Sequence, residues 1–111
     1  MAGNDKVLEL TDKTFVDEIE KSKGLTMVDF WAEWCGPCRI VGPIVDQLAE
    51  DYADQGVRVG KVDVDENPET ASRFGIRSIP SILFFKDGEH VDTVIGAVPK
   101  PHLEEKVKEH L

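Results

Sequence analysis

Residues 25–38 of this 111-residue chain have the sequence Leu-Thr-Met-Val-Asp-Phe-Trp-Ala-Glu-Trp-Cys-Gly-Pro-Cys. From 25 to 31 the chain is almost continuously apolar, with Asp29 as the exception, which is typical of a strand buried on both faces of a sheet. A helix is favoured from Pro37, because the φ of proline is already helical and its missing N–H needs no intrahelical partner in the first turn. We therefore predict that both cysteines lie at a turn from a buried strand into a helix.

The flanking residues predict further strands and helices. A strand is expected at Val7–Leu10, followed by a helix that begins at the N-cap Thr11 and carries Phe15, Val16 and Ile19 on one face. After the cysteines, a long helix is expected from about Pro37 to Ala53, with a kink at Pro43. Its apolar positions recur with a helical period: Ile40, Val41, Ile44, Val45, Leu48, Ala49 and Tyr52.

The second half of the chain favours three more strands and two helices. Strands are expected at 57–64, 82–85 and 90–95, the last two joined by a tight turn at Asp87–Gly88. A short helix between the first two should be capped by Asn67, start at Pro68 and stop at Gly75. The chain should end in an amphipathic helix that starts at 99–101 and buries Leu103, Val107 and Leu111.

This order of elements predicts an α/β fold. Alternating strands and helices imply parallel crossovers, and the later hairpin adds antiparallel strands, so we expect a single mixed five-stranded sheet flanked by four helices. Residues 1–111 are interpreted as a single domain, with 1–6 as a flexible tail. The cysteines should lie at the carboxyl end of a central strand, where open α/β sheets usually place their sites.

Composition narrows the classes of function. The 13 Lys and Arg residues are outnumbered by 22 Asp and Glu, and the resulting net charge of −9 argues against binding to nucleic acid or to anionic membranes. No apolar run of signal-peptide or membrane-span length follows the polar start, so we expect a cytoplasmic protein. In a reducing compartment, two closely spaced cysteines are catalytic or metal-binding rather than a structural framework.

The spacing of Cys35 and Cys38 favours redox chemistry. Residues three apart are neighbours on a helix, so the two sulfurs can form a disulfide. Cys35 would lie at the positive end of the helix dipole, which stabilises its thiolate, and Cys38 would lie one turn deeper. We therefore predict that Cys35 attacks and Cys38 resolves, with the uncharged Gly36 and Pro37 between them tuning the redox potential.

Metal and haem sites are weaker interpretations of the pair. A structural zinc site needs four ligands, and His90, His102 and His110 all lie far along the chain. Covalent haem attachment requires a histidine directly after the second cysteine, where Arg39 stands. An iron–sulfur cluster shared between two chains is conceivable but has only the pair to recommend it. We predict no metal and no bound cofactor.

Several motifs along the chain together resemble the thioredoxin family. They are 28–38 around the cysteines, Pro43 in the long helix, 61–65 (Lys-Val-Asp-Val-Asp), 76–80 (Ile-Arg-Ser-Ile-Pro) and 86–88 (Lys-Asp-Gly). The resemblance extends from about Val7 to Leu111. The sequence departs from the family's usual residues at Arg39, Gly42, Ser78 and Pro99, and we expect Ser78 and Pro99 to affect the choice of partner.

The resemblance implies roles for residues outside the pair. Asp29, whose pKa burial should raise, would deprotonate Cys38 through a water, and Lys61 would approach Asp29 and tune its titration. The Ile79–Pro80 bond would be cis and would present the Ile79 backbone to a substrate. The substrate-binding surface would comprise Trp34, Ile79, Pro80, Gly96 and Ala97. For an arbitrary sequence, Lys61 facing solvent, a trans Pro80 and Trp34 serving only in packing are the ordinary alternatives.

The predicted function is that of a monomeric protein-disulfide reductase. Its partners would be disulfide-containing proteins and a thioredoxin reductase that restores the dithiol. Within the same chemistry, an oxidase or isomerase is disfavoured because Gly36 and Pro37 bring no charge that would stabilise the thiolate further. The alternative from another class is a redox-independent binding subunit of a larger assembly.

Overall fold

The computed structural model describes residues 5–111. Five strands within this range form a single sheet. Its strands, in the order β1-β3-β2-β4-β5, are β1 (Val7–Leu10), β2 (Leu25–Trp31), β3 (Arg58–Asp63), β4 (Ser81–Lys86) and β5 (Glu89–Ile95). The first three strands are parallel, whereas β4 runs antiparallel to β2 and β5 antiparallel to β4. The predicted mixed sheet is confirmed, and β2 lies at its centre. Most of the tail predicted at 1–6 lies outside the described residues.

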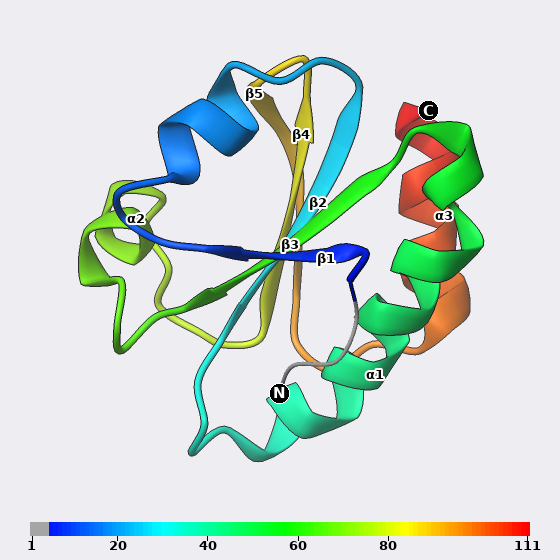
Figure 1. The fold of residues 1–111 in the computed structure, drawn as a ribbon. Helices are drawn as coiled ribbons and strands as arrows, with labels where there is room; N and C mark the ends of the chain where they lie inside the picture. The colour runs from blue at the N-terminus through cyan, green and yellow to red at the C-terminus, as the bar shows by residue number, and fades with distance from the viewer. Residues whose placement is uncertain (1–4) are drawn as a thin grey trace.

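Helical segments cover both faces of the sheet (Figure 1). The helices α1 (Gly36–Asp51) and α3 (Lys100–His110) lie on one face. The π-helical turn η1 (Val16–Glu20) and the helix α2 (Pro68–Arg73) lie on the other, and a short 3-10 turn, η2 (Ala53–Gln55), follows α1. Among the described residues, no helix has the length and apolar character needed to cross a membrane.

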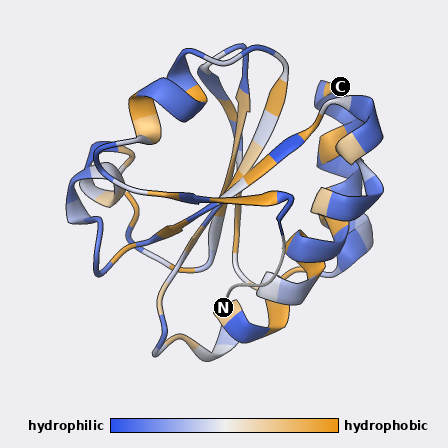
Figure 2. Ribbon diagram, in the orientation of Figure 1, coloured by the Kyte–Doolittle hydropathy of each residue, from blue (hydrophilic) through white to orange (hydrophobic). Residues whose placement is uncertain are grey.

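The alternation of side chains along β2 divides the core into two layers. Met27 packs with Val41 and Val45 of α1 on one face of the sheet. Val28 and Phe30 point to the other face, into the cluster that contains Phe15 and Ile19. In Figure 2 the helices carry both hydrophobic and hydrophilic residues, and many residues of the central strands are hydrophobic. Asp29 is two residues after Met27, so its side chain points to the same face of the sheet, towards α1.

Three residues predicted for the core are exposed instead. Ile40 is 63% exposed, because the buried face of α1 is already completed by Val41 and its successors, which leaves Ile40 at the rim. Val16 is 42% exposed, since the wider π-helical turn changes the face on which it lies. Leu111 is 48% exposed because α3 ends at His110.

The predicted N-caps are also corrected by the structure. The Thr11 hydroxyl accepts a hydrogen bond from the Thr14 amide, but the regular part of η1 begins later, at Val16. Asn67 precedes α2 without capping it through its side chain. The cap comes instead from Asp12, whose carboxylate accepts hydrogen bonds from the amides of Glu69 and Thr70. A partner 58 residues away cannot be recognised from local sequence.

The turn between β4 and β5 has the backbone of a two-residue hairpin. Asp87 and Gly88 have φ values of 51° and 87°, which is the left-handed region that such turns require. A Cβ atom on Gly88 would overlap the backbone carbonyl of Glu20, at the end of η1. Gly88 is therefore needed both for its φ and for the close approach of η1 to the hairpin.

Replacing Gly88 by alanine should destabilise the protein strongly. We expect Gly88→Ala to lower the free energy of unfolding by roughly 3 kcal/mol or more, measured by urea denaturation, since strain from positive φ adds to the clash. Gly56→Ala is the matched control: Gly56 has a φ of 79°, but nothing lies within 4 Å of its missing Cβ. It should cost only about 1 kcal/mol. Equal losses in the two variants would show that contact with Glu20 is unimportant.

Asp92 of β5 attaches the last turn of α3 to the sheet. Its Oδ2 lies 2.9 Å from His110 Nε2 and 3.1 Å from Lys106 Nζ. These interactions, with that of His110 the largest, outweigh the effect of burial and lower the pKa of Asp92 to about 2. Folding therefore favours the ionised carboxylate.

The contribution of Asp92 to stability should depend on pH. The stabilisation is fully present above the unfolded pKa of about 4 and is lost as the pH falls through about 2. We expect Asp92→Asn to lower the free energy of unfolding by about 1 to 2 kcal/mol at pH 6, and the difference from wild type to shrink towards pH 2. Asp17→Asn, which removes a highly exposed ion pair with Lys21, is the control and should have little effect. A difference that stays constant with pH would contradict this assignment.

Candidate active site

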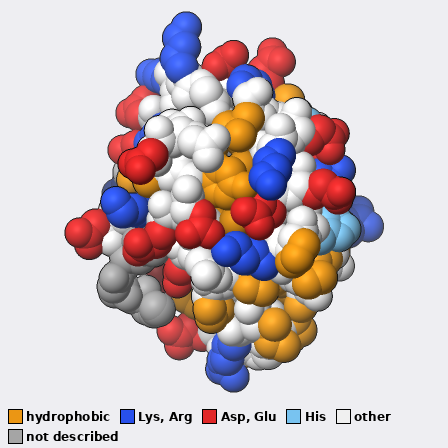
Figure 3. Space-filling view, turned by 90° about the vertical axis from the view of Figure 1, so that its right-hand side faces the viewer, with side chains coloured by type: hydrophobic (Ala, Val, Ile, Leu, Met, Phe, Trp, Pro, Cys, Tyr) orange, Lys and Arg blue, Asp and Glu red, His pale blue; other side chains and the backbone are white. Residues whose placement is uncertain are grey.

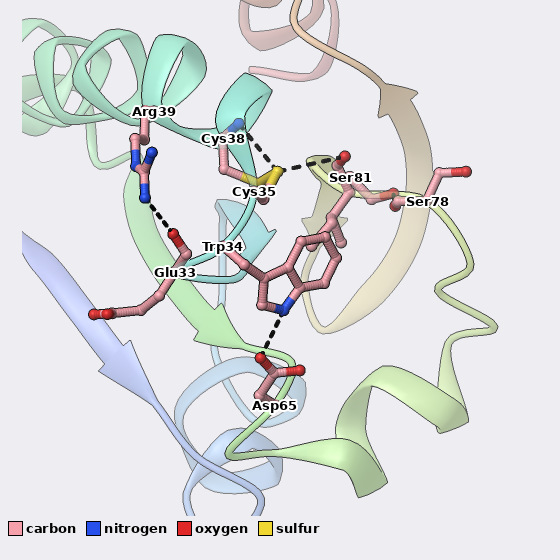
Figure 4. Close-up of a disulfide and its surroundings, with 9 residues drawn as sticks. Glu33, Trp34, Cys35, Cys38, Arg39, Asp65, Ser78 and Ser81 are labelled. Atoms are coloured by element: carbon pink, nitrogen blue, oxygen red, sulfur yellow. Dashed lines mark hydrogen bonds between the residues drawn. A yellow bond between two sulfur atoms is a disulfide. The ribbon is translucent and has the colours of Figure 1, made fainter.

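The turn from β2 into α1 brings the two cysteines together (Figure 4). Cys35 is the N-cap of α1, with extended backbone angles, and Pro37 occupies the first turn, as its fixed φ allows. Cys35 and Cys38 are joined in a disulfide, with their Cα atoms 5.3 Å apart. The disulfide therefore lies at the N-terminus of a long helix, at the carboxyl end of the central strand.

The two sulfurs have different surroundings. Sγ of Cys35 accepts a hydrogen bond from the backbone N–H of Cys38 at 3.2 Å. This N–H group and the helix dipole favour a negative charge on Cys35 when the disulfide is reduced. Exposure does not distinguish the cysteines in the oxidised form, because they are 3% and 5% exposed. The asymmetry comes from the position of Cys35 at the start of the helix.

The loop before β4 lies directly beside the disulfide. The Ile79–Pro80 peptide bond is cis, and the carbonyl oxygen of Ile79 lies 3.7 Å from Sγ of Cys35. The carbonyl of Pro80 accepts a hydrogen bond from the Gly96 amide at 2.9 Å. The structure thus brings Ile79, Pro80 and Gly96 together at one side of the sulfurs, with Ala97 next to Gly96 in the chain.

Trp34 and Arg39 each make one hydrogen bond that sequence reasoning missed (Figure 4). The indole of Trp34 is 68% exposed, and its N–H donates to Asp65 Oδ2 at 2.8 Å. The guanidinium of Arg39 donates to the carbonyl of Glu33 at 2.7 Å. The first hydrogen bond joins the turn before Cys35 to the loop after β3, and the second joins the same turn to the start of α1.

Asp29 is a buried carboxyl group behind the disulfide. It is 1% exposed, and its Oδ1 has no hydrogen-bond partner among the described residues. Burial raises the pKa of Asp29 to about 7, with Lys61 opposing and Asp46 adding to the effect. Asp29 and Cys38 both line a pocket of about 430 Å³. The carboxyl group of Asp29 is therefore suited to exchange a proton with Cys38 near neutral pH.

Lys61 reaches the same pocket from the neighbouring strand. It is the register partner of Asp29 in β3, but its ammonium group contacts Asp46 Oδ1 at 2.9 Å and lies 3.5 Å from the carbonyl oxygen of Gly42. Asp46 was not among the predicted site residues. The sequence did contain a sign that Asp46 lies near the site. Cys38, Gly42 and Asp46 follow one another at intervals of four on α1, and residues four apart lie on the same face of a helix.

The two cysteines are not part of a group of metal-ligating side chains in the described part of the chain. The three side chains that lie close enough to share an ion are Asp92 of β5 and Glu109 and His110 at the end of α3. Lys106 already contacts the Asp92 carboxylate there. These residues are accounted for by the attachment of α3 to β5.

Comparisons with known proteins agree with this geometry. Residues 6–109 match the thioredoxin family. The chain is 56% identical to Thioredoxin 1 of Synechococcus elongatus over 102 residues, which cover 92% of this chain and 94% of that protein. It is 50% identical to Thioredoxin 1 of a Nostoc species, with coverage of 93% and 95%. It is also 48% identical to the chloroplastic M-type thioredoxin of Pisum sativum, with coverage of 96% of this chain and 61% of the pea protein.

The predicted family and fold class are therefore confirmed over nearly the whole chain. The strand-to-helix turn and the cysteine pair at the helix N-terminus both lie within the matched residues 6–109. The chain belongs to the thioredoxin family, and with its Cys35–Cys38 pair it is a thiol-disulfide oxidoreductase that reduces protein disulfides.

Proposed function

We propose that Cys35 is the attacking thiol and Cys38 the resolving thiol of a protein-disulfide reductase. The observation that carries this assignment is the hydrogen bond from the Cys38 amide to Sγ of Cys35 at the helix N-terminus. The same hydrogen bond stabilises a thiolate on Cys35 in the dithiol form. Cys38 lines the pocket that contains Asp29, which supplies a base for its later deprotonation.

The reaction has two exchange steps. In the first, the Cys35 thiolate attacks one sulfur of a substrate disulfide, and the other substrate sulfur leaves as a thiolate. In the second, Asp29 takes the proton of Cys38, and the Cys38 thiolate attacks Sγ of Cys35 in the mixed disulfide. This attack breaks the bond between Cys35 and the substrate, and the second substrate sulfur leaves as a thiolate. The substrate has gained two electrons and becomes a dithiol by taking up two protons, one from Asp29 and one from solvent, while Cys35 and Cys38 are oxidised to the disulfide.

The substrate would bind over the surface around the sulfurs. Trp34, Ile79, Pro80, Gly96 and Ala97 form its proposed contacts, and Ile79 offers backbone groups for pairing with an extended substrate segment. Ser78 and Pro99 flank this region in the sequence and are proposed to influence which proteins bind.

The direction of the reaction depends on the residues between the cysteines and on the electron donor. Gly36 and Pro37 add no charge near the Cys35 thiolate, which favours a reducing pair over an oxidising one. We propose that a thioredoxin reductase returns the two electrons and that the protein works as a monomer in a reducing compartment such as the cytoplasm. Lys61 would tune Asp29 during the cycle, as its opposing effect on the Asp29 pKa supports.

Replacing the resolving thiol should trap the first intermediate. We expect Cys38→Ser to accumulate mixed disulfides with protein substrates, detected as reductant-sensitive bands on non-reducing gels, because Cys35 attacks but is not displaced. Cys35→Ser is the matched control and should trap far less. Association that persists unchanged when both cysteines are replaced would instead favour a redox-independent binding subunit.

Replacing Asp29 should separate catalysis from stability. We expect Asp29→Asn to slow release of the reduced substrate about tenfold or more near pH 7, measured by stopped-flow decay of a mixed disulfide, since the base is lost.

The same variant should be more stable than wild type in the oxidised form. The folded protein holds the Asp29 proton more tightly than the unfolded chain does, so wild-type stability falls as the pH rises from about 4 to about 7. Above that range we expect Asp29→Asn to raise the free energy of unfolding by about 2 to 4 kcal/mol, measured by urea denaturation. Asp54→Asn, in the exposed η2 turn, controls for the change of net charge. A slower reaction without added stability would contradict the burial argument.

A further inference from the structure

We propose that Asp46 is a positioning residue for this reaction: by holding the ammonium group of Lys61 on the α1 side of the pocket, it controls how readily Asp29 releases its proton. The inference rests on the proposed function, in which Asp29 takes the proton of Cys38. Asp46 itself touches neither sulfur nor substrate in this scheme, and it acts through Lys61.

The position of Asp46 on α1 places it in the same pocket as the reacting groups. Cys38, Gly42 and Asp46 are spaced by four residues, and all three line the pocket that Asp29 and Lys61 also line. Lys61 Nζ lies 2.9 Å from Asp46 Oδ1, and the two side chains are only 19% and 28% exposed. Because solvent screens such a pair weakly, each charge acts strongly on neighbouring groups.

The charged and titratable groups around Asp29 come from three elements. Lys61 projects from β3, Arg39, Cys38 and Asp46 belong to α1, and Glu33 lies in the turn after β2. The guanidinium of Arg39 is held by the Glu33 carbonyl. Of these groups, Lys61 and Asp46 act on the titration of Asp29, in opposite directions. Figure 3, which shows the face of α1 and α3, has acidic and basic side chains side by side over these helices.

Beyond the effect of burial, Asp46 raises the pKa of Asp29 directly by charge repulsion, and its contact with Lys61 adds an indirect effect in the same direction. Lys61 is the register partner of Asp29 on the adjacent strand, so its side chain starts beside that carboxyl group. The contact with Asp46 draws the ammonium group towards α1, where it also lies 3.5 Å from the Gly42 carbonyl. A Cβ at residue 42 would lie 3.7 Å from Nζ, an ordinary van der Waals distance, so this position of the ammonium group does not depend on the glycine. Without the Asp46 charge, Lys61 would stabilise the ionised form of Asp29 more strongly.

The titration of Asp29 itself provides the test. Carbon NMR of the Asp29 carboxyl group in the oxidised full-length protein gives its midpoint without reference to activity. We expect Asp46→Asn to lower that midpoint by about half a pH unit or more, as a less opposed neighbouring cation should. Asp51→Asn is the matched control: it removes a carboxylate from the same helix that pairs with Lys100, and it should leave the midpoint unchanged. An unchanged midpoint in Asp46→Asn would overturn the proposal.

A double-mutant cycle decides whether Asp46 acts through Lys61. In a Lys61→Gln background, Asp46→Asn should shift the Asp29 midpoint by less than about half of the shift seen in wild type. An equal shift in the two backgrounds would mean direct repulsion between the carboxylates and would overturn the positioning role. Asp46→Glu keeps the charge and should restore most of the wild-type midpoint.

The reaction provides a second readout that separates this inference from the proposed function. The pH profile for resolution of a mixed disulfide should move in Asp46→Asn with the Asp29 midpoint and in the same direction. A profile that stays in place while the NMR midpoint moves would overturn the role of Asp46 in the reaction. If Asp29→Asn leaves the resolution rate unchanged, the base role of Asp29 fails, whereas the NMR measurements still decide the coupling of Asp46 to Lys61.

Discussion

The burial of β2 on both faces and along both edges is the constraint on which the site depends. β2 pairs with β3 on one side and β4 on the other, and helices cover both faces. A charged residue in such a strand loses its water, so the proton of Asp29 is held more tightly than in solvent. The same strand leads into the turn that carries the cysteines, and the buried carboxyl group therefore faces the pocket behind the disulfide.

The start of α1 provides the complementary half of the site. A helix N-terminus has amide groups without intrahelical partners, and here one of them donates to Sγ of Cys35. In the proposed reaction, the helix N-terminus would stabilise the Cys35 thiolate, and Asp29, whose pKa is raised to about 7, would accept the proton of Cys38. Lys61 and Asp46 lie between β3 and α1 and exert opposing effects on the pKa of Asp29. The unequal roles that we propose for two chemically identical cysteines rest on these surroundings.

Local sequence patterns were sufficient where one dominant signal was present. The apolar run at 25–31 predicted β2 with its observed bounds, and Asp87–Gly88 predicted the hairpin, because only such residues adopt positive φ cheaply. Apolar periodicity was less reliable at the ends and rims of helices, as the exposed Ile40 and Leu111 show. Periodicity gives the direction of a buried face but not its width, which depends on what packs against it.

The sequence by itself determined the family, the order of strands and helices, the mixed sheet and the identity of the cysteine pair. The strands, helices and mixed sheet follow from hydrophobic period and turn residues, which are local, whereas the family follows from the resemblance of several motifs along the chain. Only the tertiary structure decided which distant groups meet: Asp12 at the N-terminus of α2, Asp65 at the Trp34 indole, and Asp46 at Lys61. Such contacts join residues from 15 to 58 positions apart, and any of many acidic side chains would satisfy the same local pattern. The packing of the sheet against its helices decides which of these acidic side chains makes each contact.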